Sequence, residues 1–271
     1  MRSQADLLRE PWNALIILDA CRADALGSLA PGVETVRSLA WITYDWIRRF
    51  VPLFGQERLL YVSSNPVVER ELARHKHNWQ VRSVWRDGWR RSGPCAMPAV
   101  TAAETAFAVS QHLSVYGQPE RMIVHFLQPH VPYVGDPGLP YSGWGGGMDD
   151  PLSVAVGEHT TVEAALARGL CTIEQVRLAY QANVELAVRY ALPMASDWLK
   201  GKVVLTADHC ELLALDGEPG YGHAKWDPKL YQVPWLAWDH GPFEPAPVPE
   251  LIHPQDVDAD VHAKLEALGY E

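Results

Sequence analysis

Short apolar runs alternate along the chain with longer stretches of helical periodicity. The runs have little polar alternation, which is typical of strands that helices cover on both faces. The pattern predicts an α/β protein with a central, largely parallel sheet and helices on both faces. The predicted strands are residues 14–18, 59–63, 81–85, 122–127 and 203–206, with a weaker one at 233–238 that Pro234 opens.

Helices are expected between these runs, around residues 67–75, 99–116 and 172–199, with a short one at 259–268. In the long helix Thr172 is a suitable N-cap and Gly201 a suitable stop, while Pro193 should kink or interrupt it. Residues 134–157 are rich in glycine and proline and predict an irregular loop, which could act as a lid. Residues 241–271 read as a surface crossing that leads to the C-terminal helix. With no repeat or clear linker, residues 1–271 are expected to form one domain.

Composition excludes several classes of protein. The chain has 271 residues, with 23 Lys+Arg against 33 Asp+Glu and a net charge of −10, which argues against a general nucleic-acid binder. The four cysteines are widely spaced and predict neither a disulfide framework nor a thiolate zinc site. The first apolar run ends at Asp19, too early for a signal peptide, and no stretch approaches the length of a membrane span. A cytoplasmic protein is expected.

Carboxylates and imidazoles follow three of the predicted strands. Asp19 follows the first strand, Asp208 and His209 follow the fifth, and the fourth contains His125 and leads to His130. Ligands bind beyond the carboxyl ends of strands in open parallel sheets, so these groups could converge on a divalent metal such as Zn²⁺ or Mn²⁺. Taken singly, each aspartate could be a turn residue or a helix cap, and His125 a hydrogen-bonded core residue.

Several motifs also resemble those of sulfatase-like hydrolases in the alkaline phosphatase superfamily, in the same order. Residues 17–24 (ILDACRAD) resemble their first metal-binding strand, and residues 125–133 (HFLQPHVPY) resemble their P-H-x-P-Y element. Residues 204–211 (VLTADHCE) are similar to their T/S-x-D-H-G-E signature, with Cys210 where glycine is usual. The later G-Y-G-H at 220–223 and Val233-Pro234 are similar to their last motifs. The resemblance spans nearly the whole chain and implies an alkaline phosphatase-like fold.

The resemblance implies one divalent metal ion, Zn or Mn first and Ca or Mg next, held by Asp19, Asp208, His209 and the oxygen of a nucleophilic side chain. Ordinary sulfatases derive that nucleophile from a cysteine motif that neither Cys21 nor Cys95 fits. Relatives such as phosphoethanolamine transferases use threonine instead. The best candidate is Thr43, in a W-I-T-Y-D-W segment that looks like the T-x-x-W segment of archaeal sulfatase-like proteins; Ser38 is the other candidate, and Thr43 could instead be a buried or helix-capping residue.

The implied activity is hydrolysis or transfer of an anionic phosphate ester, a diester or a monoester, through a covalent phosphothreonine at Thr43. His130 and His223 would bind the phosphoryl oxygens or protonate the leaving group. Glu211 is expected to orient His209 from behind, or to be a solvated charge at a helix start. Arg22 would neutralise substrate charge or pair with Asp24 as a structural bridge. The sequence shows no second set of metal ligands.

Two other functions stay open besides a sulfatase. Because Cys210 and the 41–46 segment depart from the family pattern, the chain could be a non-catalytic relative that binds a glycan, a nucleotide or a lipid head group. Residues 79–91 alternate aromatic and arginine residues, as in single-stranded nucleic-acid binders. The same pattern fits a strand and turn with tryptophan in the core and arginine outside, which we favour, so no nucleic-acid partner is expected.

Overall fold

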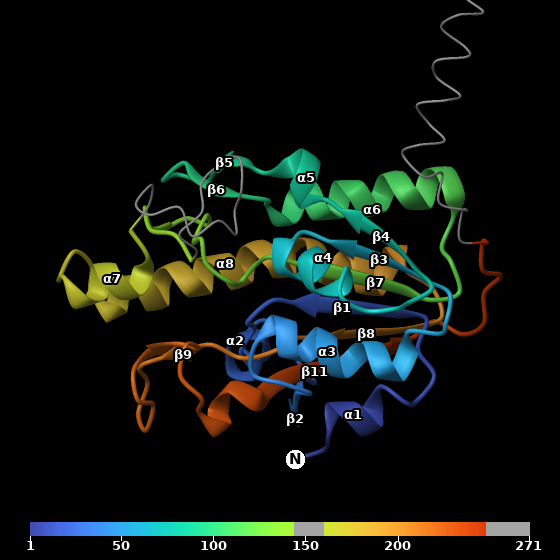
Figure 1. Cartoon of the computed structure of the whole chain (residues 1–271), viewed down its shortest axis with the longest axis horizontal. Helices are drawn as coiled ribbons and strands as arrows, with labels where there is room; N and C mark the ends of the chain where they lie inside the picture. Colours follow the sequence, from blue (N-terminus) through green and yellow to red (C-terminus); the bar gives the residue numbers. More distant parts are fainter. Residues whose placement is uncertain (144–159, 248–271) are drawn as a thin grey trace, which may run out of the picture.

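The part of the chain that this computed structural model describes comprises residues 1–143 and 160–247, and its centre is a seven-stranded sheet (Figure 1). In chain order the strands are β1 (Ala14–Leu18), β2 (Glu34–Arg37), β3 (Leu59–Ser63), β4 (Trp79–Ser83), β7 (Met122–Phe126), β8 (Lys202–Thr206) and β11 (Gln232–Asp239). Across the sheet they are ordered β2-β11-β8-β1-β7-β3-β4. The five strands from β8 to β4 run parallel, and β11 runs antiparallel to its two neighbours. The predicted fold class is confirmed.

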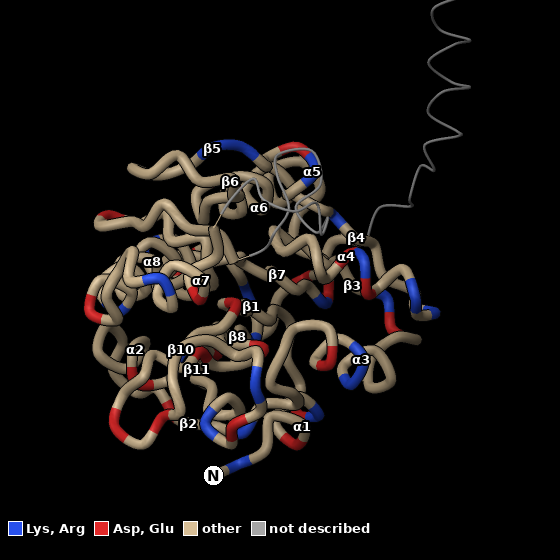
Figure 2. The backbone as a smooth tube through the Cα atoms, turned by 60° about the vertical axis from the view of Figure 1, so that its left-hand side comes forward, with Lys and Arg blue, Asp and Glu red and all other residues tan. Residues whose placement is uncertain are grey.

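Helices cover both faces of the sheet. On one face α6 (Ala102–Tyr116) and α2 (Ala23–Gly27) both pack against α8 (Ile173–Pro193) (Figures 1 and 2). On the other face α3 (Thr43–Phe54) packs against α4 (Pro66–Leu72). This arrangement agrees with right-handed crossovers, because the chain crosses the sheet in one direction through α3 and α4 and returns through α6 and α8. The shorter helices are α1 (Gln4–Leu7), α5 (Trp85–Gly88) and α7 (Val162–Ala167).

The central strands form where the sequence predicts them. β1, β3 and β7 are buried at every position, which explains their continuous apolar runs. β4 begins and ends two residues earlier than predicted, because Val84 and Trp85 belong to the turn that starts α5. β2 was not predicted, since it is a short edge strand with only Val36 buried.

Capping side chains define the helix starts. Thr172 caps α8 in a capping box with Gln175, as expected, and the helix gives way to a π-helical turn (Met194–Trp198) directly after Pro193. α6 begins later than predicted, after Thr101, because Met97–Ala99 forms β6 and pairs with β5 (Arg90–Ser92). α4 starts at Pro66 after an asparagine cap. The helix α3 is not among those predicted.

Some predictions fall wholly or partly outside the described residues. Of the predicted loop 134–157, the structure describes residues 134–143, which form bends without a helix or strand. The rest of that loop and the predicted helix 259–268 lie outside. Among the described helices none is both long and apolar enough to cross a bilayer. That residues 1–271 form a single domain stays a prediction.

Residues 79–91, the stretch rich in aromatic residues and arginines, form β4 and α5 and begin β5. Trp79 is buried and belongs to β4. Three of the four arginines in this stretch pair with nearby carboxylates: Arg82 with Asp87, Arg86 with Glu69 and Arg90 with Glu104. This arrangement fits the strand-and-turn interpretation that we favoured over a nucleic-acid site.

Candidate metal centre and active site

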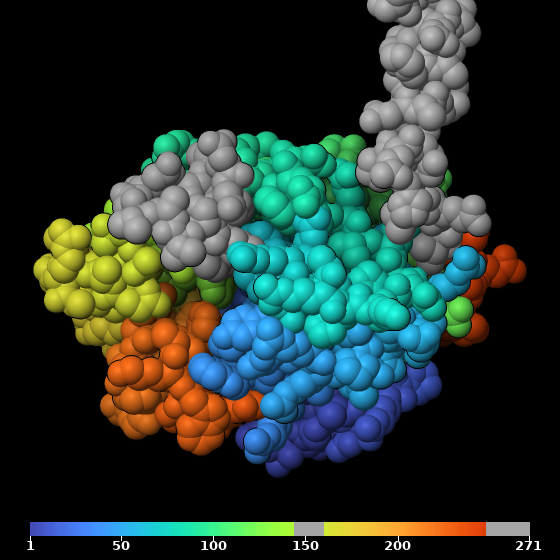
Figure 3. Space-filling view, viewed as in Figure 1, coloured from blue at the N-terminus to red at the C-terminus, as the bar shows by residue number. Residues whose placement is uncertain are grey.

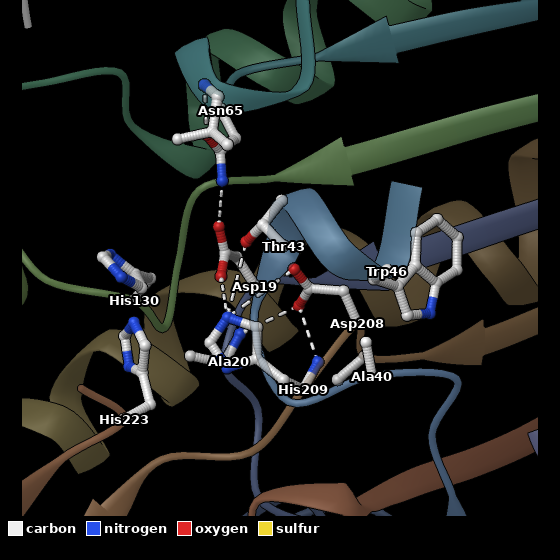
Figure 4. A network of polar contacts seen from close by, with 12 residues as sticks. Asp19, Ala20, Ala40, Thr43, Trp46, Asn65, His130, Asp208, His209 and His223 are labelled. Carbon is white, nitrogen blue, oxygen red and sulfur yellow. Dashed lines mark hydrogen bonds and ion pairs between the residues drawn. The ribbon is translucent and has the colours of Figure 1, made fainter. Parts of the chain in front are cut away.

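Two neighbouring strands and one helix bring the four predicted metal ligands together. Asp19 follows β1, Asp208 and His209 follow β8, and Thr43 is the first residue of α3 (Figure 4). His209 Nε2 lies 3.4 Å from Thr43 Oγ1, 3.4 Å from Asp19 Oδ1 and 3.7 Å from Asp208 Oδ2. All four side chains are buried.

Each carboxylate has one oxygen fixed by hydrogen bonds and one that faces the cluster. Asp208 Oδ1 accepts from the backbone N–H groups of Ala20 and His209, at 3.2 and 2.9 Å. Asp19 Oδ2 accepts from Asn65 Nδ2. Asp19 Oδ1 and Asp208 Oδ2 have no hydrogen-bond partner among residues 1–143 and 160–247, although both atoms are buried. Buried charge of this kind is costly unless a cation compensates it.

The carboxylates and imidazoles of the cluster shift one another's pKa values. Burial would lower the pKa of His209, but Asp208 and Asp19 raise it to about 10. Burial would likewise raise the pKa of Asp19, and the imidazoles of His130 and His209 bring it well below its usual range. His209 Nδ1 donates to the Cys210 carbonyl at 2.9 Å, so Nε2 is the nitrogen that faces the carboxylates.

The four residues fit one divalent ion. Two atoms that each lie about 2.1 Å from an ion are separated by about 3.0 to 4.2 Å, depending on the angle between them. The separations of 3.4 and 3.7 Å around His209 Nε2 fall inside that range. Carboxylate oxygens with one imidazole and one hydroxyl suit Zn²⁺ or Mn²⁺.

A second polar group lies beside the first. His223 Nδ1 donates to Glu211 at 3.0 Å, and its ring centroid is 4.6 Å from that of His209 and 5.2 Å from that of His130. Figure 4 shows His130 and His223 next to each other beside Asp19. Ligand atoms of His130, Glu211 and His223 lie within 4.8 Å of one another, close enough to hold an ion. His130, Glu211 and His223 are thus a second group that could hold a metal ion, which the sequence did not predict.

The structure corrects the predicted partner of Glu211. Glu211 binds His223, while His209 has its Nδ1 occupied by the Cys210 carbonyl next to it in the chain. Burial would raise the pKa of Glu211, but His223 lowers it, so the carboxylate is charged. Glu211 therefore orients His223 and not His209.

The side chain of Arg22 is held by two acidic side chains and a backbone carbonyl. Its guanidinium forms two hydrogen bonds with Asp24, at 2.9 and 2.7 Å, and one with Glu218 at 2.7 Å. A fourth hydrogen bond, 2.8 Å long, goes to the backbone carbonyl of Glu211. Arg22 lines a different cavity from the one beside Thr43. The geometry favours the structural bridge over the alternative role in substrate binding.

Three supporting residues escaped the sequence analysis or were given another role. Asn65 lies between Asp19 and α4: its Nδ2 holds Asp19 and its Oδ1 caps the helix through Val67. Asn65 comes two residues after the end of β3, a position from which it could have been predicted in the same way as Asp19. Ser38, the other candidate nucleophile, donates instead to the Asp208 carbonyl.

Gln4 is the third, and no sequence signal indicates it. The side chain is fully buried and donates to Thr206 Oγ1 at 3.0 Å and to the Ala207 carbonyl at 2.9 Å. Its Oε1 accepts from Trp46 Nε1 at 2.9 Å and from the Leu39 N–H at 3.1 Å. Gln4 thereby ties α3, which carries Thr43, to the end of β8.

A cavity of about 210 Å³ opens beside the cluster. Segments far apart in the sequence form its walls, and Figure 3 shows the start of α3 beside the segment near residue 220. The first N–H groups of a helix lack intrahelical partners, so the start of α3 suits an anion. No lysine or arginine is among its described lining residues, which are Trp41, Ile42, Thr43, Tyr44, Asn65, Val67, His130, His223 and Ala224.

Comparison with known proteins identifies the fold. No protein-family model matches the sequence, and no curated protein matches it in sequence. Among solved structures, the chain is similar to the soluble domain of lipooligosaccharide phosphoethanolamine transferase A from Neisseria meningitidis, with 13% identity, a TM-score of 0.52, and coverage of 83% of this chain and 75% of that one. The integral membrane form of the same transferase gives 12% identity, a TM-score of 0.52 and coverage of 83% and 47%. The fold of this chain is therefore alkaline phosphatase-like.

Proposed function

We propose that this protein is a metal-dependent enzyme that cleaves or transfers a phosphate ester, with Thr43 as the nucleophile. One observation carries the proposal. Asp19 Oδ1 and Asp208 Oδ2 are buried, have no hydrogen-bond partner among the described residues, and lie 3.4 and 3.7 Å from His209 Nε2. Thr43 Oγ1 lies 3.4 Å from the same nitrogen, so all the separations fit ligands of one ion. Asp19, Asp208, His209 and Thr43 would hold the ion.

A bound divalent ion would supply positive charge for the phosphoryl oxygens and lower the pKa of the Thr43 hydroxyl. The hydroxyl proton is lost to solvent, and Thr43 Oγ1 attacks phosphorus as the bond to the leaving oxygen breaks. The backbone N–H groups at the start of α3 donate to the phosphoryl oxygens. Water or an alcohol then attacks the phosphothreonine and releases Thr43, which completes hydrolysis or transfer.

His223 is placed to handle the proton of the leaving group. Glu211 fixes the Nδ1–H, so His223 presents Nε2, which donates a proton to the leaving oxygen and later takes one from the incoming water or alcohol. His130 donates its Nδ1–H to the Val131 carbonyl at 2.5 Å and lines the same cavity, where it binds phosphoryl oxygens.

The charge of the site favours a phosphodiester over a phosphomonoester. Asp19, Asp208 and Glu211 carry three negative charges, which one divalent ion and the proton that His223 donates would only just balance, and the described lining of the cavity has no lysine or arginine. A diester adds a single negative charge to this site, whereas a monoester dianion adds two and meets more repulsion at neutral pH. A sulfate monoester also carries one charge, which keeps the sulfatase alternative within the scope of the test.

The test uses the purified chain with Zn²⁺ or Mn²⁺ and three aryl esters: a phosphodiester, a phosphomonoester and a sulfate. We expect turnover of the diester above the other two, loss of at least about 10³-fold with Thr43→Ala, and retention of the fold. Thr35→Ala on the exposed edge strand β2 is the matched control. After an acid quench, mass spectrometry should find the phosphoryl group on the peptide that contains Thr43.

Three results would contradict the proposal. Substantial turnover by Thr43→Ala would refute Thr43 as the nucleophile. Preference for the sulfate would favour the sulfatase alternative. A protein that is inert on all three esters but binds a glycan, a nucleotide or a lipid head group would be the non-catalytic relative.

A further inference from the structure

His125 lies at the candidate metal centre, although the sequence favours a core residue at that position. It belongs to β7, which pairs with β1, and it lies opposite Ile17, two residues before Asp19. The side chain is fully buried. Its Nδ1 is 2.9 Å from the Tyr61 hydroxyl on β3.

The other ring nitrogen of His125 has no hydrogen-bond partner among the described residues. Nε2 lies 3.7 Å from Asp208 Oδ2, which is too far for a hydrogen bond. Nε2, Asp19 Oδ1 and Asp208 Oδ2 are all buried atoms without such a partner, and His125, Asp19 and Asp208 each place one ligand atom within 4.8 Å of the other two. A buried polar atom usually finds a partner, so three such atoms at one place fit a site for a positive ion.

The 3.7 Å separation between His125 Nε2 and Asp208 Oδ2 is one that two ligands of the same ion can have. Two ligand atoms about 2.1 Å from one ion, at an angle of about 120°, lie about 3.6 Å apart. Histidine ligands commonly donate their second ring N–H to a neighbouring oxygen, and the Tyr61 hydroxyl is at the right distance to accept it.

We infer that His125 is a further ligand of the ion held by Asp19, Asp208, His209 and Thr43. The inference rests on the metal site of the proposed function and adds a third strand, β7, to it. Two imidazoles in place of one favour Zn²⁺ and Co²⁺ over Mg²⁺ and Ca²⁺, which prefer oxygen ligands. The ion would then join the central strands β8, β1 and β7 at their carboxyl ends.

The first experiment compares metal binding by the wild type, His125→Leu and Tyr61→Phe, with Zn²⁺ affinity from competition with a chromogenic chelator and the visible spectrum of bound Co²⁺. His125→Leu should weaken Zn²⁺ binding by about 100-fold or more and change the Co²⁺ spectrum. Tyr61→Phe removes only the support of the ligand and should cost about tenfold with the spectrum preserved. A loss of tenfold or less for His125→Leu, or an unchanged Co²⁺ spectrum, would overturn the inference.

The second experiment leaves His125 in place, so it does not depend on whether the leucine variant folds. X-ray absorption of one equivalent of Zn²⁺ counts the imidazoles on the ion, in a His130→Gln, His223→Gln protein that lacks the neighbouring imidazoles. Two imidazoles support the inference and one overturns it. A wild type that binds no Zn²⁺ would overturn the proposed function as well, which separates the two failures.

Discussion

Replacing Gln4, the first residue of α1, tests whether this side chain supports the candidate site. Gln4→Met keeps the length of the side chain and removes its hydrogen bonds. The Trp46 indole N–H and the Leu39 N–H would lose the acceptor that the structure gives them, and the Ala207 carbonyl would lose a donor. A buried polar group left without a partner costs about 1–3 kcal/mol, so the three groups together should lower the free energy of unfolding by about 4 kcal/mol.

The assay is urea unfolding of the metal-free protein, with Gln118→Met as the matched control. Gln118 is also buried and forms two hydrogen bonds, both with the backbone of Lys200, at 3.0 and 2.7 Å. Its replacement should cost about 2 kcal/mol. Because Gln4 links α3 to the end of β8, Gln4→Met should also weaken Zn²⁺ binding, whereas Gln118→Met should not. Equal losses of stability and unchanged Zn²⁺ affinity in both variants would refute the reasoning.

Three further predictions concern the site itself. Asn65→Asp should lower kcat by about 100-fold, because a second carboxylate replaces the amide that donates a hydrogen bond to Asp19. Steady-state kinetics measures the effect, with Asn65→Ser as the comparison. Equal kcat values for the wild type and Asn65→Asp would contradict this prediction. The pKa of His209 in the metal-free protein is raised to about 10, so a bound ion must displace a proton from it. Zn²⁺ affinity should therefore increase about tenfold per pH unit between about pH 6.5 and 10. A series of Zn²⁺ titrations at different pH values measures this increase, and no increase would contradict His209 as a ligand. The same raised pKa stabilises the metal-free fold below pH 6.5, and that contribution is lost as the pH rises towards 10. Glu211→Gln should lower kcat about 100-fold with little change in KM, because His223 loses the carboxylate that orients it; a change confined to KM would point to substrate binding instead.

The sequence predicts the centre of this molecule well because burial leaves a simple signal there. β1, β3 and β7 are covered on both faces, so their residues are apolar at every position. Polar residues follow β1 and β8, and because the two strands are parallel they place these residues at the same edge of the sheet, where ligands bind. Asp19, Asp208 and His209 could therefore be proposed as neighbours from the sequence.

Other features depend on contacts that no local pattern encodes. β2 is an edge strand of four residues with only Val36 buried, too short for a burial pattern to stand out. Gln4 acts through partners more than 30 residues away in every case, so only the folded chain shows its role. The partner of Glu211 was mistaken because the Cys210 carbonyl, one residue from His209, competes for the same ring nitrogen.

The most direct test of the central claim is a Zn²⁺ titration of the metal-free protein by calorimetry. The account predicts that the wild type binds at least one equivalent tightly and that Asp208→Asn weakens this binding by about 100-fold or more, because it removes charge from a buried oxygen that faces the ion. Asp216→Asn, at an exposed position, is the control and should bind as the wild type does. A wild type that takes up no Zn²⁺, or an Asp208→Asn variant that binds it equally well, would contradict the account.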